Sequence, residues 1–335
     1  RFVTLADRLA SWYAPVVHSL ALAAFLGWWL VAGIAWTEAL LIACAVLIIT
    51  CPCALGLAVP AVQVVASERL LKRGVLLKAA TALERLAQVR HVVFDKTGTL
   101  TRGRPELVDT GGIPADALAL AAGMAAQSRH PLARALKRAV AEAAPVSGVE
   151  ERPGLGLEAA GPRGRLRLGR GSWVAGDAAA ASAGAGLELW FTDGARGPWR
   201  LGFEDAARDD AAATLRTLER AGYTVELLSG DRPAAARALA DALAVDAVTA
   251  EASPKAKVER LEALRAEGVR ALMVGDGLND APALAAAHAS ISPASAMDVS
   301  QTAADAVFQG EQLGAVVDTL ATARAADRLV RQNLA

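Results

Sequence analysis

The stretch HVVFDKTGTLT at residues 91–101 decides the fold. It begins with the apolar run 91–94 and turns polar at Asp95, a pattern that predicts a buried parallel strand. Similar runs occur at 225–228 and 271–274, each followed by glycine and aspartate. Helical patterns, such as those at 206–221 and 234–243, separate these runs, so we expect an α/β fold with a doubly wound parallel sheet. Ligands bind such sheets at the carboxyl ends of the strands.

Asp95 is the candidate nucleophile at that edge. A carboxylate can attack phosphorus to form an aspartyl phosphate, and the turn around Gly98 offers backbone N–H groups to phosphate oxygens. Phosphoryl transfer also needs a metal and charge neutralisation. For charge neutralisation we expect Ser229 to donate a hydroxyl hydrogen bond and Lys257 to supply a positive charge. We expect Asp276 to join Asp95 around Mg²⁺, and Asp280 to orient Lys257 or the metal shell.

The front of the chain is apolar. The chain is 54% hydrophobic with a net charge of +0, and residues 12–34 and 39–67 contain no Asp, Glu, Lys or Arg. Each run exceeds the ~20 residues needed to cross a bilayer. We expect a transmembrane hairpin over residues 1–68 in a multi-pass membrane protein, with both ends in the cytoplasm by the positive-inside rule. The even charge balance provides no basic surface for a nucleic acid.

Cys51-Pro52-Cys53 lies inside the second apolar run. The proline breaks the helix and frees carbonyl groups. Two thiols beside that break could bind a soft metal, either Cu(I) or Zn(II), and thiolate chemistry alone does not choose between them. We interpret Cys44 as a packed residue.

Residues 105–199 interrupt the alternation of strands and helices. Two helical segments are followed by glycine-rich strands at 154–160, 165–169 and 187–192. We therefore expect an inserted α+β domain at 105–199. The insert would separate a connector and first part of the sheet domain at 69–104 from the remainder of that domain at 200–335, which leads to a further transmembrane helix. We expect the stretch 68–87 to form a helical, amphipathic connector.

Three motifs resemble the signature of P-type ATPases, which belong to the haloacid dehalogenase superfamily: DKTGTLT at 95–101, Ser229-Gly230-Asp231, and MVGDGLNDAP at 273–282. Cys51-Pro52-Cys53 resembles the metal site of the heavy-metal branch, and CPCALGLA at 51–58 is similar to its copper pumps. The resemblance implies ATP-driven export of Cu(I), or of Zn(II), Cd(II) or Pb(II), across a bacterial inner membrane with cytoplasmic ATPase domains. It also implies possible delivery of the metal by a metallochaperone.

The resemblance adds residues to the site. It implies catalytic roles for Lys96, Thr97, Gly230 and Asp231, a role for Thr97 at Mg²⁺, and a nucleotide role for Asn279. SRHP at 128–131 resembles the family's Ser-Glu-His-Pro motif, whose histidine holds adenine, and so implies that His130 and Pro131 bind ATP beside a turn at Gly154 and Gly156. The sequence departs from that family pattern at Ala125, Arg129 and Ala159.

Two other functions compete with a metal pump. A membrane-tethered phosphatase of the same superfamily would carry a second aspartate, as acid and base, where this chain has Thr97. A non-catalytic metal-binding membrane module would not need Asp95, Lys257 and Asp276. The chain contains no Thr-Gly-Glu, the actuator-domain loop that promotes phosphoenzyme hydrolysis in P-type ATPases. We therefore expect a fragment of a pump that cannot complete the cycle alone.

Overall fold

A computed structural model of the chain describes residues 2–50, 53–79, 81–177, 186–276, 280–296 and 298–334. The chain divides into two compact units. The first contains Arg1–Val89, Asp305–Phe308 and Ala315–Ala335, and the second contains Arg90–Ala304 and Gln309–Gly314.

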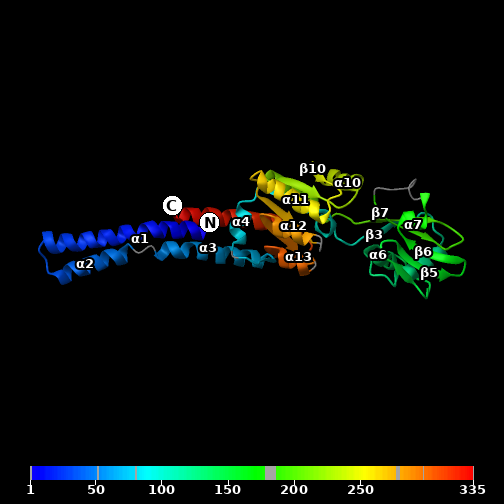
Figure 1. The fold of residues 1–335 in the computed structure, drawn as a ribbon, viewed down its shortest axis with the longest axis horizontal. Coiled ribbons are helices and arrows are strands. Elements are labelled where there is room, and N and C mark those ends of the chain that lie inside the picture. Colours follow the sequence, from blue (N-terminus) through cyan, green and yellow to red (C-terminus); the bar gives the residue numbers. More distant parts are fainter. Residues whose placement is uncertain are drawn as a thin grey trace. The chain divides into compact units, whose positions relative to one another are not determined.

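The first unit is mainly helical (Figure 1). Its helices are α1 (Phe2–Leu26), the π-helical turn η1 (Gly27–Val31), α2 (Trp36–Ile49), α3 (Cys53–Lys72), α4 (Ala82–Ala87) and most of α14 (Gly314–Leu334). The second apolar run of the sequence is thus divided into α2 and α3. Val59 of α3 and Val330 of α14 form a small buried cluster between these helices.

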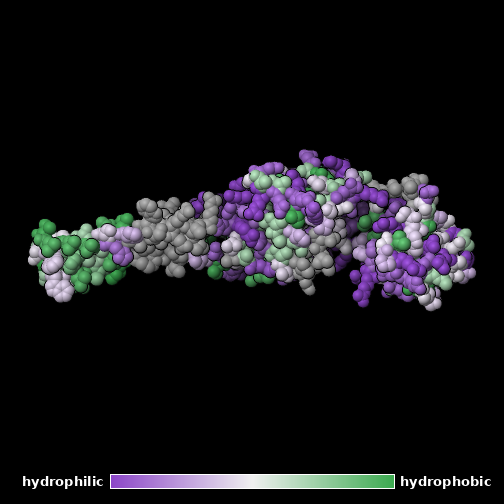
Figure 2. Space-filling view, viewed as in Figure 1, coloured by the Kyte–Doolittle hydropathy of each residue, from purple (hydrophilic) through white to green (hydrophobic). Residues whose placement is uncertain are grey.

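Apolar side chains are exposed on α2 and on α1 from residue 15 onwards, where Figure 2 shows a green region. Val31 is 88% exposed and Ile49 is 82% exposed. Within the described residues, no helix combines the length and the apolar character that crossing a membrane requires. The transmembrane hairpin therefore stays a prediction.

A short strand interrupts the connector after α3. We expected one amphipathic helix from Glu68 to Ala87, and this was wrong: α3 ends at Lys72, and β1 (Val75–Leu77) follows. The cause is Gly74, whose φ of +76° leaves the helical region. β1 pairs antiparallel with β13 (Ala306–Phe308) in the same unit.

The second unit contains the predicted parallel sheet. The strands are β2 (His91–Asp95), β9 (Thr224–Leu228), β10 (Ala247–Thr249), β11 (Ala271–Val274) and β12 (Ala289–Pro293). Within this unit they lie in the order β12-β11-β2-β9-β10, with parallel pairing throughout. The helices of this part are α9 (Ala211–Arg220), α10 (Pro233–Leu243), α11 (Pro254–Ala266), α12 (Ala281–Ala286) and α13 (Asp298–Ala303). The α/β fold class is confirmed.

The predicted helix 206–221 begins late. α9 begins at Ala211, because the preceding residues are hydrogen-bonded to the segment that follows β2. The Arg102 amide donates to the Ala206 carbonyl at 3.0 Å, and the Arg208 amide donates to the Leu100 carbonyl at 2.8 Å. Tertiary hydrogen bonds thus replace the first helical turns that the sequence pattern predicted.

The insert forms a separate antiparallel sheet. Its six strands are ordered β3-β8-β7-β6-β5-β4. Their bounds are β3 (Glu106–Asp109), β4 (Glu150–Arg152), β5 (Gly156–Gly161), β6 (Gly164–Gly169), β7 (Leu187–Thr192) and β8 (Trp199–Glu204), and the helices are α5 (Ala115–Ala125), α6 (Pro131–Ala139) and α7 (Gly171–Val174). The buried side chains of α5 and α6 pack on the sheet. β8 continues past position 199, where we expected the insert to end.

Candidate functional site

Parallel pairing brings the three polar strand ends together. β2 lies between β11 and β9, with Phe94 opposite Val274 and Asp95 opposite Leu228. The residues that follow β9 and β11 therefore reach the same edge of the sheet as Asp95. The three polar strand ends therefore lie at one edge of the sheet, as the sequence predicted.

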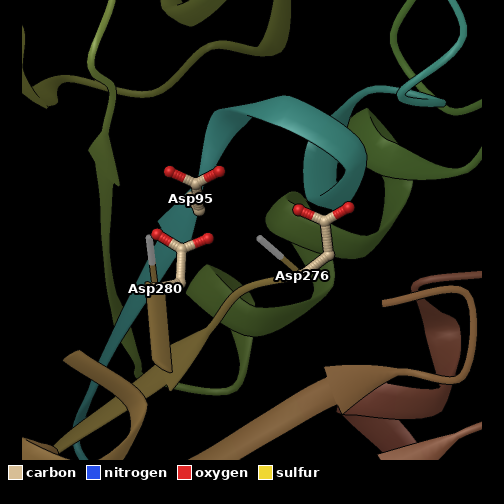
Figure 3. A group of neighbouring side chains, drawn as sticks. All are labelled: Asp95, Asp276 and Asp280. Carbon is tan, nitrogen blue, oxygen red and sulfur yellow. The ribbon is translucent and has the colours of Figure 1, made fainter. Parts of the chain in front are cut away.

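Three carboxylates meet at this edge. Each of Asp95, Asp276 and Asp280 offers an oxygen, and these oxygens all lie within 4.8 Å of one another. Figure 3 shows Asp95 at the end of its strand, with the carboxylates of Asp276 and Asp280 beside it. Oxygen ligands of this kind suit Mg²⁺, which binds proteins through one or two carboxylates plus phosphate and water. The donor set therefore fits the predicted metal.

Burial and the close approach of the carboxylates raise the pKa values of Asp95 and Asp276. Burial, followed by the charge of Asp280, raises the pKa of Asp95 from 3.8 to about 6, although Lys257 opposes this. Burial, followed by the charges of Asp95 and Asp280, raises the pKa of Asp276 to about 7. Like charges in a buried space disfavour simultaneous ionisation. A cation at this point would relieve that repulsion.

Lys257 supplies one positive charge. It projects from the first turn of α11, a helix capped by the Ser253 hydroxyl, which accepts from the Ala256 amide at 3.2 Å. Its ammonium donates to Asp280 Oδ1 at 2.6 Å and also to Asp95 Oδ1. Burial lowers the pKa of Lys257, but the attraction of Asp95 and Asp280 outweighs it and raises the pKa. Lys257 is thus a charged bridge between the two carboxylates.

The loop after Asp95 makes room for Asp276. Gly98 has φ of +70°, and a Cβ there would overlap the Asp276 carboxyl group. The Gly98 amide donates to the Thr101 hydroxyl at 3.0 Å, which in turn donates to Asp205 at 2.6 Å. Thr97 is exposed. Only a residue without a side chain fits at position 98 in this arrangement.

Arg208 is part of the site that the sequence analysis missed. Its buried guanidinium donates to the carbonyls of Thr99 and Gly98, at 2.7 Å each, and to the carbonyl of Glu311 at 2.7 Å. Its charge also lowers the pKa of Asp276, against the larger effect of burial. Backbone acceptors have no sequence signature, so no pattern could identify this contact.

The remaining predicted residues of the edge lie at the end of β9. Ser229 is buried, and its hydroxyl accepts from the Asp231 amide at 3.1 Å. The Lys96 ammonium forms an ion pair with Asp231. Gly230 is exposed between them. The structure therefore brings Lys96 and Asp231 together at the strand ends beside Asp95.

A cavity of about 410 Å³ lies mainly in the insert, with Arg232 before α10 also in its lining. Its lining includes His130, Gly154 and Gly156, so three residues of the predicted nucleotide site face one space, with Ser128 beside them. His130 precedes α6, and its Nδ1 accepts from the Leu132 amide at 3.3 Å. Pro131 is the first residue of α6 and is not among the lining residues. The volume is in the range typical of small-molecule sites.

Some predicted residues lie outside the described part of the chain. These are Cys51 of the metal site and Asn279 of the nucleotide site. Cys53 is the first residue of α3. For the cysteine pair, the structure therefore adds only the position of Cys53 at the start of a helix.

The geometry agrees with comparisons to known proteins. The haloacid dehalogenase-like hydrolase family matches residues 89–288. The "Nitrogen fixation protein FixI" of Bradyrhizobium diazoefficiens is 45% identical over 339 residues, covering 100% of this chain and 46% of that protein. "Copper-transporting ATPase 2" of Rhizobium meliloti is 35% identical over 356 residues, covering 98% of this chain and 42% of that protein. The chain belongs to the heavy-metal P-type ATPases.

Solved P-type ATPases share the fold. The crystal structure of a zinc-transporting PIB-type ATPase in the E2.Pi state superposes with a TM-score of 0.78 and 31% identity, covering 97% of this chain and 56% of that one. The catalytic domain of the CPx-ATPase CopB-B has a TM-score of 0.64 and 26% identity, covering 77% of this chain and 98% of that one. The chain spans about half the length of the curated relatives it matches.

Replacing Asp276 with Asn should stabilise the Mg²⁺-free protein at alkaline pH. The folded pKa is about 7, against an ordinary value of 3.8, so the stability that the neutral carboxyl contributes is present below about pH 4 and is lost as the pH rises towards 7. Asp276→Asn should unfold later in urea than the unmodified protein at pH 8, by on the order of 1–3 kcal/mol, since one pKa unit corresponds to about 1.4 kcal/mol. The difference should shrink as the pH falls to 4.

The exposed Asp209, whose side chain is 89% exposed, provides the matched control. Asp209→Asn should give a small difference that does not depend on pH in this range. A pH-independent effect of Asp276→Asn would contradict the raised pKa of Asp276.

Proposed function

We propose that this chain is the catalytic region and part of the transport region of a membrane pump that uses ATP to export Cu(I) through an aspartyl phosphate on Asp95. The observation that carries the proposal is the meeting of Asp95, Asp276, Asp280 and Lys257 at the carboxyl edge of the sheet. The chemistry of this cluster fits phosphoryl transfer, which depends on positioning and charge neutralisation.

Asp95 is the group that attacks. One carboxylate oxygen would form a bond to the γ-phosphorus while the bond to the β–γ bridging oxygen breaks, so that ADP leaves. Attack requires the ionised carboxylate, and the contact with Lys257 opposes the effect of burial on the pKa of Asp95. Asp95 and Asp276 would hold Mg²⁺, with Thr97 beside it, and the ion would supply charge neutralisation for the phosphoryl oxygens.

Neighbouring groups would bind the transferred phosphoryl group. Lys257 provides a positive charge at Asp95, and Asp280 holds that ammonium in place. Ser229 lies buried at the adjacent strand end, where its hydroxyl accepts from the Asp231 amide and keeps its own hydrogen for donation to a phosphoryl oxygen. Lys96 and Asp231 form the side of the site next to Ser229.

The residue at position 97 favours a pump over a phosphatase. A phosphatase needs an acid and base two residues after the nucleophile, and a threonine hydroxyl does not titrate in the working pH range. The aspartyl phosphate on Asp95 should therefore persist, and its energy would be available for a conformational step.

The cavity in the insert is the proposed site for ATP. Gly154 and Gly156 present backbone without side chains to the cavity, and His130 provides an aromatic ring at its wall. Two of the departures from the family pattern are buried in the core of the insert and are not among the residues that line the cavity: Ala125 is 1% exposed and Ala159 is 5% exposed.

The transported ion would bind Cys51 and Cys53. Soft thiolates suit Cu(I), and several of the relatives carry copper transport or export in their names. Zn(II) is the second candidate, favoured by the likeness to the zinc-transporting structure. The apolar surface of α1 and α2 supports placement of this unit in a membrane, where a metallochaperone could deliver the ion.

Asp95→Asn should abolish covalent labelling of the full-length protein. With radiolabelled γ-phosphate ATP and Mg²⁺, the unmodified protein should retain acid-stable label that hydroxylamine removes, because an acyl phosphate is cleaved by that nucleophile. Loss should be complete in the variant, since an amide is a poor nucleophile. Asp209→Asn should label normally. Persistent labelling of Asp95→Asn would reject this nucleophile.

Changing Cys51 and Cys53 to Ser should remove metal-stimulated ATPase activity of the full-length protein. We expect stimulation of the unmodified protein by Cu(I), and a fall of more than about tenfold in the double variant, because a hydroxyl is a poor ligand for a soft ion. Cys44→Ser should retain stimulation. Stimulation by Zn(II) instead would favour the second candidate ion, and unchanged stimulation in the double variant would exclude this pair.

His130→Ala should weaken ATP binding by the full-length protein. Loss of ring contacts should raise the Kd by about five- to thirtyfold, equivalent to roughly 1–2 kcal/mol. Isothermal titration with a non-hydrolysable ATP analogue measures the affinity. Arg129→Ala, at the exposed neighbouring position, is the control. Equal Kd values for His130→Ala and the unmodified protein would remove His130 from the nucleotide site.

A further inference from the structure

A second charged cluster lies under α11, separate from the three carboxylates. Glu226 of β9 is 2% exposed and receives two bonds from Arg260 of α11, Nε to Oε1 at 2.9 Å and Nη2 to Oε2 at 3.0 Å. His91 of β2 contacts Glu226 through Nε2 at 2.9 Å. The Thr249 hydroxyl donates to Glu226 Oε1 at 3.3 Å. None of these residues belongs to the proposed phosphorylation site.

Glu226 is held in its charged form. Burial raises its pKa, but the bonds from His91 and Arg260 outweigh this and lower the pKa to about 2. A buried ion pair adds little net stability, because removing the charges from water costs about as much as their attraction returns, and apolar residues of similar size often serve as well. The ion pair does, however, fix geometry. A bidentate guanidinium–carboxylate pair holds its two groups at a set distance and in a set orientation.

The cluster and the phosphorylation site share one face of the sheet. Side chains alternate along a strand, so His91, Val93 and Asp95 of β2 lie on the same side. Glu226 and Leu228 of β9 likewise share a side. Val93 and Leu228 are packed with Leu261 and Leu264 of α11 in one buried cluster. α11 therefore covers the face that carries both Asp95 and Glu226.

α11 carries a cation for each of these carboxylates. Lys257 and Arg260 are three residues apart, which places them on neighbouring positions of one helix face. Lys257 contacts Asp95, at the carboxyl end of β2, and Arg260 contacts Glu226, farther back on β9. The helix is thus attached at two points, while its apolar contacts with the sheet are non-directional.

We propose that Glu226 is a positioning residue: its fork with Arg260, supported by His91, fixes the rotation and height of α11 so that Lys257 reaches Asp95. The proposal rests on the proposed role of Asp95 and Lys257 in phosphoryl transfer. Glu226 touches neither of them, and it acts through the helix that carries Lys257.

The test is phosphoenzyme formation by full-length Glu226→Gln. The isosteric amide accepts only one bond from Arg260, so α11 can shift. We expect the rate of labelling at saturating ATP to fall by about tenfold or more, because a misplacement of ~1 Å can cost on the order of 100-fold. The KM for ATP should stay within about twofold, because the nucleotide cavity lies mainly in the insert. Arg260→Lys, which keeps the charge but loses the fork, should behave in the same way.

Two controls separate positioning from stability. Glu259→Gln removes an exposed ion pair with Lys255 on the same helix and should label at the normal rate. The triple replacement of His91→Leu, Glu226→Met and Arg260→Met substitutes apolar residues for the cluster. It should keep a Tm close to that of the unmodified protein yet still label slowly. Rates are expressed per folded molecule, so Glu226→Gln remains decisive if the triple variant is poorly folded.

The outcomes are distinct. A normal labelling rate per folded molecule in Glu226→Gln or in the triple variant would overturn the positioning role. Equal slowing in Glu259→Gln would also overturn it, because that residue does not contact the sheet cluster. Absence of label from the unmodified protein would instead reject the proposed function at Asp95, whatever the variants do.

Discussion

The contacts of the buried Lys257 ammonium with Asp95 and Asp280 are the interaction on which the proposed phosphorylation site depends. Asp95 ends one strand and Asp280 begins the helix after another, and the bonds from Lys257 hold these two carboxylates at one point. A buried carboxylate cluster without a cation would repel itself and favour protonation. The position of α11 therefore determines whether the sheet edge is a site for phosphate or only a crowded acidic cluster.

Arg208 and Glu226 extend that dependence to the surrounding fold. Arg208 connects the segment before α9 to the carbonyls of the loop after Asp95, and Glu226 connects β9 to α11. Both are buried charged residues with several partners. Arg208 holds the loop that follows Asp95, and Glu226 holds the helix that carries Lys257, so the geometry around Asp95 depends on neighbours that do not contact it.

The sequence predicted the parts of the fold that depend on local pattern. The apolar runs ending at Asp95, Leu228 and Val274 are strands, and parallel pairing explains why their polar ends meet. The sequence-based prediction was wrong where tertiary contacts override local helix preference. The helix expected from Ala206 begins at Ala211 because backbone hydrogen bonds to residues 100–102 occupy the intervening segment. Arg208 could not be predicted, since its partners are backbone carbonyls brought close only by folding.

The contact that caps α6 has a consequence for chemical selectivity. Because the Leu132 amide donates to Nδ1 of His130, that nitrogen carries no hydrogen, and the neutral imidazole must be the Nε2–H tautomer. The ring can then offer a donor, and no acceptor, through its second nitrogen. A purine edge that carries lone pairs can accept from this N–H, whereas an exocyclic amino group cannot, because it is itself a donor. The helix cap thus determines that His130 would present a hydrogen-bond donor, and no acceptor, to a ligand in the cavity.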